Sequence, residues 1–297
     1  MKQLLILSGK GGTGKTTIAS SFIKLSKANA YADCDVDAPN LHLIMPQHLQ
    51  PICSDYFGMP KAIIDPVRCT NCGLCKQHCR FEAVQFTGKY KKYEIDPFSC
   101  EGCGVCEKIC PSSAITLTSL PAGELMMYTG NEVFSTAKLK MGSGTSGKLV
   151  TEVKKQLKSA ASDINANFAV IDGSPGIGCP VIASLSGVDL VLIVTEPSIS
   201  GISDMERIIE TAHKFQTPVA VCINKFNTNL KNTEKIISYC EKNNITFAGT
   251  IPFDKTAVKA INNGQSVIDL DCAAATSIKE VFQNTTAMLF YEVNNKI

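Results

Sequence analysis

Eight residues near the start of the chain, GKGGTGKT at 9–16, constrain its fold more than any other feature. They fit the pattern G-x-x-x-x-G-K-[ST], in which glycines let backbone N–H groups approach phosphate oxygens. An apolar stretch at 3–7 comes before the pattern, and a helix-forming stretch follows it. A strand that turns through glycines into a helix is the context this pattern needs, and the helix N-terminus adds partial positive charge. The chain is therefore expected to contain a phosphate-binding α/β domain.

The rest of the chain continues the same alternation of strands and helices. Apolar segments bounded by turn residues predict further strands within 30–39, 167–176, 188–198, 218–226 and 245–254. Helix-forming segments, such as 202–215, lie between them. This order predicts a parallel sheet with crossover helices.

Between residues 57 and 120 the pattern changes to short segments rich in Gly-Cys pairs and Asp-Pro turns. Residues 64–86 are echoed by residues 95–117, and each copy holds the spacing C-x2-C-x2-C-x3-C. This is the two-cluster pattern of bacterial ferredoxins, in which the fourth cysteine of one run ligates the other cluster. It predicts two [4Fe–4S] clusters, the first held by Cys69, Cys72, Cys75 and Cys110, and the second by Cys100, Cys103, Cys106 and Cys79. Zinc is the alternative metal, although zinc sites usually combine pairs of C-x2-C.

The composition sets limits on location and partners. Fourteen cysteines in a chain of 297 residues favour metal ligation in a reducing compartment over disulfides. The apolar stretch Leu4–Leu7 is too short for a signal peptide, so a cytoplasmic location is expected. With 29 basic and 27 acidic residues, the charge gives no reason to expect nucleic acid as a partner. Residues 277–293 are amphipathic but not lysine-rich, which favours a packed helix over a membrane anchor.

The form KGGTGKT, with a lysine at position 10, resembles the deviant Walker A motif of the MinD/ParA-type ATPases. The resemblance implies an ATP-dependent homodimer in which Lys10 reaches the phosphates bound by the partner copy. It also implies that Lys15 contacts the β- and γ-phosphates and that Thr16 ligates Mg²⁺. The residues expected to bind ATP are Gly9, Lys10, Gly11, Gly12, Thr13, Gly14, Lys15, Thr16, Thr17 and Asn224.

Other positions follow from the same resemblance. The acidic strand end DCDVDAPN is similar to switch I of that family, with Asp35 orienting the attacking water and Asp33 near the Mg²⁺ side. Asp37 is the candidate for capping a helix. Asp172 resembles the Walker B aspartate that holds Mg²⁺, and Asn224 resembles the asparagine that contacts adenine.

Six cysteines lie outside the two runs, and Cys179 is the most informative of them. The nitrogenase iron protein, a relative of the MinD type, has a cluster-bridging cysteine at a similar distance from its Walker B aspartate. Its other bridging cysteine would correspond to Thr145 here, so a cluster bridging the two subunits is not expected. The glycine-rich segment that contains Ser146 and Lys148 is either a mobile loop or the start of a helix. Cys34, Cys53, Cys222, Cys240 and Cys272 are expected mainly as reduced core residues.

Taken together, the chain resembles MinD-type ATPases that carry an inserted two-cluster ferredoxin domain. The expected domains are an ATPase domain at 1–56 and 121–297, interrupted by a ferredoxin domain at 57–120. The leading hypothesis is an ATPase in which ATP closes a homodimer and gates electron transfer through the clusters to a redox partner. The alternatives are a cluster assembly or carrier ATPase of the Mrp type acting on an iron–sulfur client, and a ParA-type positioning ATPase with structural clusters.

Overall fold

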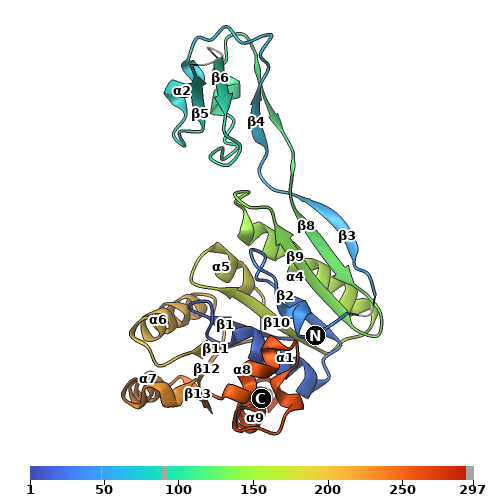
Figure 1. Ribbon diagram of the computed structural model, residues 1–297, viewed down its shortest axis with the longest axis vertical. Coiled ribbons are helices and arrows are strands. Elements are labelled where there is room, and N and C mark those ends of the chain that lie inside the picture. The colour runs from blue at the N-terminus through green and yellow to red at the C-terminus, as the bar shows by residue number, and fades with distance from the viewer. Residues whose placement is uncertain (48, 89–91, 292–297) are drawn as a thin grey trace. The chain divides into compact units, whose positions relative to one another are not determined.

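The computed structural model describes residues 1–47, 49–88 and 92–291 (Figure 1). The chain divides into two compact units. The first unit comprises Met1–Cys53, Leu125–Ala137 and Ser146–Ile297, and the second comprises Ser54–Glu124 and Lys138–Thr145. The domain boundaries predicted above, with an independent module at 57–120, stay a prediction.

The largest sheet among the described residues has nine strands in the order β13-β12-β11-β1-β10-β2-β9-β8-β3. The strands are β1 (Lys2–Ser8), β2 (Ala30–Asp33), β3 (Ile52–Phe57), β8 (Pro121–Tyr128), β9 (Val133–Leu139), β10 (Phe168–Pro175), β11 (Leu190–Thr195), β12 (Val219–Asn224) and β13 (Thr246–Ile251). The pairings from β13 through to β9 are parallel, and the five apolar segments predicted as strands all form strands here.

The prediction of a wholly parallel sheet was incomplete. The neighbouring strands β8 and β9 are joined only by residues 129–132. Such a connection is too short for a crossover, so this pair is an antiparallel hairpin. The sheet is therefore mixed but largely parallel.

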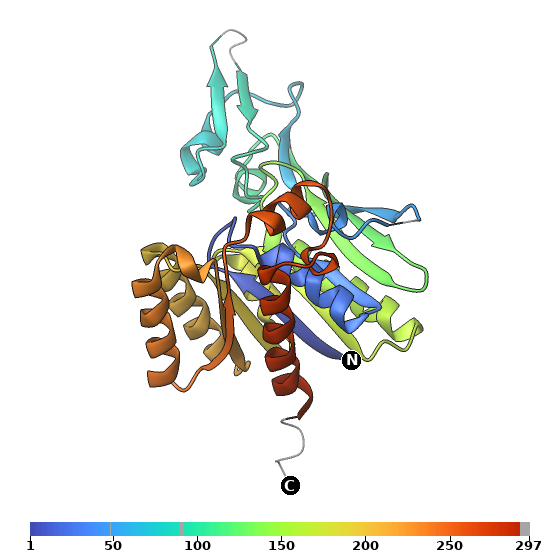
Figure 2. The ribbon, with the colours of Figure 1, turned by 60° about the horizontal axis from the view of Figure 1, so that its bottom comes forward.

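Helices cover both faces of the central strands because those strands are apolar on both sides. They are α1 (Lys15–Ser26), α4 (Ser146–Asp163), α5 (Cys179–Leu185), α6 (Ile199–Lys214), α7 (Leu230–Lys242), α8 (Lys255–Asn262) and α9 (Ala273–Tyr291), with 3₁₀ turns at Leu41–Leu43, Phe226–Thr228 and Val267–Asp269. In Figure 2 the blue α1 and the red α9 lie side by side over one face of the sheet. Phe22 of α1 and Val281 of α9 are buried there with Leu4 and Ile6 of β1.

The C-terminal amphipathic segment behaves as predicted within the described residues. Ile278, Val281 and Leu289 of α9 are buried in the core, while residues 292 and 293 lie outside the described range. Among the helices that the structure describes, none is long and apolar enough to cross a membrane.

The second unit contains two antiparallel pairs and two short helices. β4 (Lys61–Ile64) pairs with β7 (Ile115–Thr118), and β5 (Val84–Thr87) pairs with β6 (Lys92–Ile95). α2 (Leu74–His78) and α3 (Val105–Lys108) each follow a glycine with a φ of 79°. The sequence repeat is thus a structural repeat, in which each strand from one half pairs with a strand from the other.

The core of the second unit is small. Its buried members are Ala62, Cys75, Ala83, Val84, Cys100 and Ile115. A core of this size rarely supplies enough burial to hold a fold by itself, which is why small domains use disulfides or metals as staples. The two cysteines in this core therefore lie where a metal group would add most to stability.

Candidate functional site

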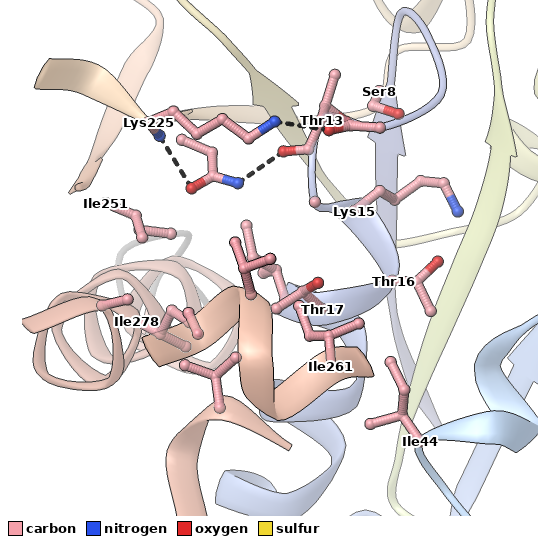
Figure 3. A pocket seen from close by; sticks show the side chains of 18 of the residues that line it. Ser8, Thr13, Lys15, Thr16, Thr17, Ile44, Lys225, Ile251, Ile261 and Ile278 are labelled. Atoms are coloured by element: carbon pink, nitrogen blue, oxygen red, sulfur yellow. Dashed lines mark hydrogen bonds between the residues drawn. The ribbon is translucent and has the colours of Figure 1, made fainter. Parts of the chain in front are cut away.

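The carboxyl ends of the parallel strands meet at one edge of the first unit, where ligands bind in sheets of this kind. β1 ends at Ser8, and the chain turns through a glycine-rich loop into α1 at Lys15. Gly12 and Gly14 have φ angles of 79° and 92°, which residues with a Cβ rarely adopt. The loop lines a cavity of about 440 Å³, to which every predicted nucleotide-binding residue except Gly9 contributes (Figure 3).

At Gly9, glycine is required by close packing and not by the backbone conformation. A Cβ atom at this position would lie 2.1 Å from the Cβ of Asp204 in α6. The loop therefore packs directly against α6, and Gly9 permits that close approach without lining the cavity itself.

Lys15 and Thr16 converge on one carboxylate. The Lys15 ammonium lies 2.6 Å from Oδ1 of Asp172, and the Thr16 hydroxyl donates to Oδ2 at 2.6 Å. Burial by itself lowers the pKa of Lys15, but the ion pair with Asp172 outweighs it and raises that pKa. Hydroxyl and carboxylate oxygens suit Mg²⁺, so the donor set of Thr16 and Asp172 fits the predicted ion.

Asp33 organises the loop that follows β2. It is fully buried and accepts hydrogen bonds from the backbone N–H groups of Asp35, Asn40 and Leu41 at 2.8–3.0 Å. Burial and, next, the charge of Asp172 raise the pKa of Asp33 to about 7. The helix-capping role predicted for Asp37 was wrong, because Asp33 accepts from the first residues of the 3₁₀ turn and Asp37 is exposed.

Asp35 follows Asp33 by two residues and lines the nucleotide cavity. Burial raises the pKa of its carboxyl group, while Lys15 opposes that effect. A carboxylate at the cavity wall can accept a hydrogen bond from a water molecule, so its position is compatible with the predicted role. That role stays a prediction.

Lys10 is held by its own chain. Its ammonium forms an ion pair with Glu196, and it also donates to the hydroxyls of Ser198 and Ser200 at 3.3 Å each. Lys225 approaches the same carboxylate of Glu196 at 3.5 Å. The sequence analysis did not predict that Glu196 and Lys225 belong to the site. Their position could have indicated it, because each directly follows an apolar strand of a parallel sheet.

Asn224 joins β12 to the phosphate loop. Its Nδ2 donates to the carbonyl of Thr13 at 2.7 Å, and its Oδ1 accepts from the backbone N–H of Lys225 at 2.9 Å. The Lys225 ammonium donates to the carbonyl of Gly12 at 2.8 Å (Figure 3). A Cβ at Gly14 would lie 2.3 Å from Nδ2, so this contact also requires glycine there. Contact of Asn224 with adenine stays a prediction.

The remainder of the cavity wall is apolar. Ile44, Ile251 and Ile261 point toward the space beside Thr17 (Figure 3). A cavity with backbone N–H groups and a lysine at one end and aliphatic side chains at the other can take a charged phosphate chain and a flat apolar base. The geometry therefore suits a nucleoside triphosphate.

In the second unit, the eight cysteines of the two runs line two cavities. Cys69, Cys72, Cys75 and Cys110 line what we call the first thiol cavity. Cys79, Cys100, Cys103 and Cys106 line the second thiol cavity. Each cavity joins three cysteines of one run to the fourth cysteine of the other, and all eight are free thiols.

The donor chemistry of these cavities fits a [4Fe–4S] cluster. Burial raises the pKa of Cys75 and Cys106, so their thiolates need a bound cation to persist. Within the described ranges, no set of three or more His, Cys, Asp or Glu residues converges closely enough to hold a single metal ion. Four sulfurs that surround a cavity without meeting at one point suit a cluster, whose irons bind separate thiolates, better than one zinc ion.

The cysteines outside the runs are dispersed. Cys34, Cys222 and Cys240 are buried, whereas Cys179 is exposed at the first position of α5. Thr145 belongs to the second unit, where its hydroxyl lies 3.1 Å from that of Tyr56. Of the two alternatives for Ser146 and Lys148, the structure has the helix, since α4 begins at Ser146.

Comparison with known proteins gives a consistent result. Residues 4–267 match the model of the CobQ/CobB/MinD/ParA nucleotide binding domain. The chain is 35% identical over 286 residues to an uncharacterised protein of Methanocaldococcus jannaschii, covering 95% of both chains. It is 24% identical over 275 residues to the septum site-determining protein MinD of Bacillus subtilis, covering 89% of this chain and 81% of that protein.

Two further similarities concern a carrier protein and the fold. An iron–sulfur cluster carrier protein of Methanococcus maripaludis is 27% identical over 141 residues, covering 42% of this chain and 49% of that protein. The solved structure of the cell division ATPase MinD of Pyrococcus furiosus has a TM-score of 0.58 at 15% identity, covering 97% and 99% of the two chains. MinD of Pyrococcus horikoshii, solved with Mg-ADP, has a TM-score of 0.57 at 15% identity, with 100% and 99% covered.

Proposed function

The chain belongs to the CobQ/CobB/MinD/ParA nucleotide-binding family of P-loop ATPases, and on that basis we propose that it is an ATP-dependent iron–sulfur redox protein. ATP binding and hydrolysis at a homodimer interface gate electron transfer through two [4Fe–4S] clusters to a partner protein. One observation carries the proposal: a chain with a complete phosphate loop also builds two cavities, each lined by four free thiols from both cysteine runs.

The nucleotide half of the mechanism rests on three charged groups. Lys15, now paired with Asp172, exchanges that carboxylate for the β- and γ-phosphates of ATP. Asp172 and Thr16 would hold Mg²⁺, and the ion would neutralise phosphate charge. Asp35 orients the water that attacks the γ-phosphorus, and its position on the cavity wall supports this role.

Lys10 couples nucleotide binding to dimer formation. In the single chain its ammonium is paired with Glu196 and hydrogen-bonded to Ser198. In the dimer it exchanges these partners for the phosphates bound by the second copy. A lysine that has defined partners in both states allows ATP to bias the equilibrium between monomer and dimer.

The cysteines supply the redox half. When bound, each cluster accepts or donates one electron. Both cavities include an exposed cysteine, Cys72 in the first and Cys103 in the second, so each lies within reach of a partner at the surface. Buried Cys75 and Cys100 keep the other side of each cavity dry.

The experiment compares electron transfer with and without nucleotide. The anaerobically reconstituted full chain is reduced with dithionite, freed of excess reductant, and mixed with an oxidised one-electron acceptor in the presence or absence of MgATP. We expect MgATP to change the transfer rate of the unmodified chain and to leave that of Lys10→Ala unchanged. Equal rates with and without MgATP in the unmodified chain would contradict the proposal.

A second candidate function is cluster assembly or carriage, which the partial similarity to an iron–sulfur cluster carrier protein favours. Carriers of that type use a C-x-x-C pair late in the chain, but after Cys110 this sequence has only isolated cysteines. A cluster held by four thiolates, of which only one is exposed, also exchanges slowly. Transfer of the clusters to an apo-protein in the presence of a chelator would favour the carrier function.

A further inference from the structure

The repeat in the second unit allows the two thiol cavities to be compared position by position. Each residue of the first half corresponds to the residue 31 positions later, as Cys69 corresponds to Cys100. The backbone follows the same rule: the N–H of Asp65 donates to Ala114 at 2.7 Å, and that of Asp96 donates to Ala83 at 2.8 Å. Since the frame is shared, differences between the cavities come from individual side chains.

Three pairs of corresponding residues that line the cavities differ in kind. The first thiol cavity has hydroxyl groups where the second has a carboxylate, a methyl group and a phenyl ring. The pairs, with the first cavity named first, are Thr70 and Glu101, Tyr93 and Ala62, and Ser112 and Phe81. At these three positions the first cavity has polar, uncharged side chains, whereas the second has two apolar side chains and one acidic one; the other lining side chains, cysteines aside, are apolar in both cavities.

Two polar groups at the first cavity lie close to one of its sulfur atoms, that of Cys110. The Ser112 hydroxyl is 3.6 Å from the sulfur of Cys110, and the Ala114 N–H donates to the same sulfur at 3.3 Å. The residue that corresponds to Ser112 is Phe81, whose side chain has no hydrogen to donate. Hydrogen bonds to a ligand sulfur stabilise the more negative, reduced state of a cluster.

Tyr93 adds a second hydroxyl at the same cavity. A methyl group added to Gly73 would lie 2.8 Å from the Tyr93 hydroxyl oxygen. At the corresponding Gly104, the same methyl group would meet an apolar Leu117 carbon at 3.4 Å. The wall facing these equivalent glycines is thus polar in the first cavity and apolar in the second.

Most nearby charged side chains also favour reduction of the first cluster over reduction of the second. The residue after the third cysteine is the cation Lys76 in the first run and the anion Glu107 in the second, and the Glu107 carboxylate accepts from the Leu117 N–H at 3.1 Å. Together with Glu101, this places two carboxylates around the second cavity. A negative charge near a cluster opposes the addition of an electron.

Two cations near the second cavity, Lys61 and Arg80, favour reduction of the second cluster instead. Lys61 donates to the carbonyl of Cys100 at 2.5 Å, but it also lies near the Asp96 carboxylate, which offsets its charge. Arg80, where the other half has Pro111, is exposed to water, which screens its guanidinium. Neither contacts a sulfur atom, so the direct donors at Cys110 dominate; Glu101 lines the second cavity but is exposed, so water reduces its effect as well.

We propose that the cluster in the first thiol cavity has the higher electron affinity and accepts the first electron. Ser112 and Tyr93 stabilise added negative charge at the first cavity, whereas Glu101 opposes added negative charge at the second. This inference rests on the proposed function, since it requires both clusters. It assigns a direction to electron flow, from the second cavity to the first, with one electron transferred and no proton.

The test measures the potential of each cluster in the reconstituted full chain. Samples are poised stepwise at an electrode without nucleotide, and the reduced clusters are quantified by electron paramagnetic resonance. We expect two separate reduction waves. Ser112→Ala should shift the higher-potential wave to more negative values, Ser112→Thr should leave it in place, and Glu101→Gln should shift the lower-potential wave to more positive values. Phe81→Leu, at the position equivalent to Ser112, is the matched control and should shift neither wave.

Two results overturn the inference: a single wave in the unmodified chain, or a shift of the lower-potential wave in Ser112→Ala. Should Ser112→Ala fail to load iron, Glu101→Gln decides the question, because it must shift the lower-potential wave alone. The outcomes also separate this inference from the proposed function. A chain that binds no iron refutes both, whereas two clusters of equal potential refute only the inference about direction.

Discussion

The ion pair between Lys10 and Glu196 makes a quantitative prediction about dimer formation. If Lys10 must leave Glu196 before it can reach the partner's phosphates, the pair opposes the dimer. Glu196→Gln keeps the size of the side chain and its capacity to hydrogen-bond but removes the charge that holds Lys10. We expect this variant to form the ATP-bound dimer more readily than the unmodified chain.

The structure sets the size of the effect. The side chains of Lys10 and Glu196 are 36% and 20% exposed, so the pair is partly screened by water. A pair of this kind contributes about 1 kcal/mol, at the upper end of measured surface pairs. Two such pairs open when a symmetric dimer forms, which gives about 2 kcal/mol. The dimer dissociation constant of Glu196→Gln should therefore be lower by about 30-fold.

Sedimentation velocity with a non-hydrolysable ATP analogue and Mg²⁺ measures that constant directly. Asp189→Asn is the matched control, because it removes the half-buried ion pair of Asp189 with Lys2 at 3.1 Å and should leave the dimer unchanged. An unchanged or higher dissociation constant for Glu196→Gln would refute the reasoning, since it would mean that Lys10 is not restrained by Glu196 before dimer formation.

Three further predictions concern Lys15, Asp33 and Cys79. Without nucleotide, Lys15→Ala should lower the free energy of unfolding by about 3–5 kcal/mol in urea denaturation, because it leaves the carboxylate of Asp172 buried without its cation; an unchanged midpoint would contradict this. The pKa of Asp33 is about 7 in the folded chain and about 3.9 in the unfolded chain. Between these values the folded state binds a proton that the unfolded state has lost. The free energy of unfolding without nucleotide should therefore fall by up to about 4 kcal/mol as pH rises from about 4 to 7. Asp33→Asn should remove that slope in the same measurement, and a slope that persists would count against it. Cys79→Ala should abolish the electron paramagnetic resonance signal of the second cluster and spare the first, whereas Cys272→Ala should spare both; loss of the first signal alone would show that each run holds its own cluster.

Local patterns were sufficient for much of the fold. The phosphate loop could be recognised because a glycine-rich turn between a strand and a helix depends on a few adjacent residues. The central strands, such as β11, could be recognised because burial on both faces requires a continuous apolar run. The strands β9, β8 and β3, which complete one side of the sheet, were missed because their sequences are mixed in character, and the places of β9 beside β2 and of β3 beside β8 depend on neighbours that are distant in the chain.

The acidic segment after β2 shows where sequence reasoning went wrong. Asp33, Asp35 and Asp37 are equivalent by composition, and only their burial separates their roles. Asp33 is fully buried and accepts three backbone N–H groups, Asp35 lines the cavity and Asp37 is exposed. The alternation of a strand end distinguishes one face from the other but does not say which carboxylate the following loop will fold around.

The sequence by itself determined the motifs of this protein: a phosphate loop with an extra lysine, and two cysteine runs whose spacing predicts two clusters. The tertiary structure decided which groups hold those residues. Glu196 restrains Lys10, and Ser112 approaches Cys110 while Phe81 takes the equivalent place beside the second cavity. The physical reason is distance along the chain. A motif is a short-range pattern that the backbone dictates directly, whereas the partner of a charge or a sulfur atom comes from a different strand or repeat and is determined only when the chain has folded.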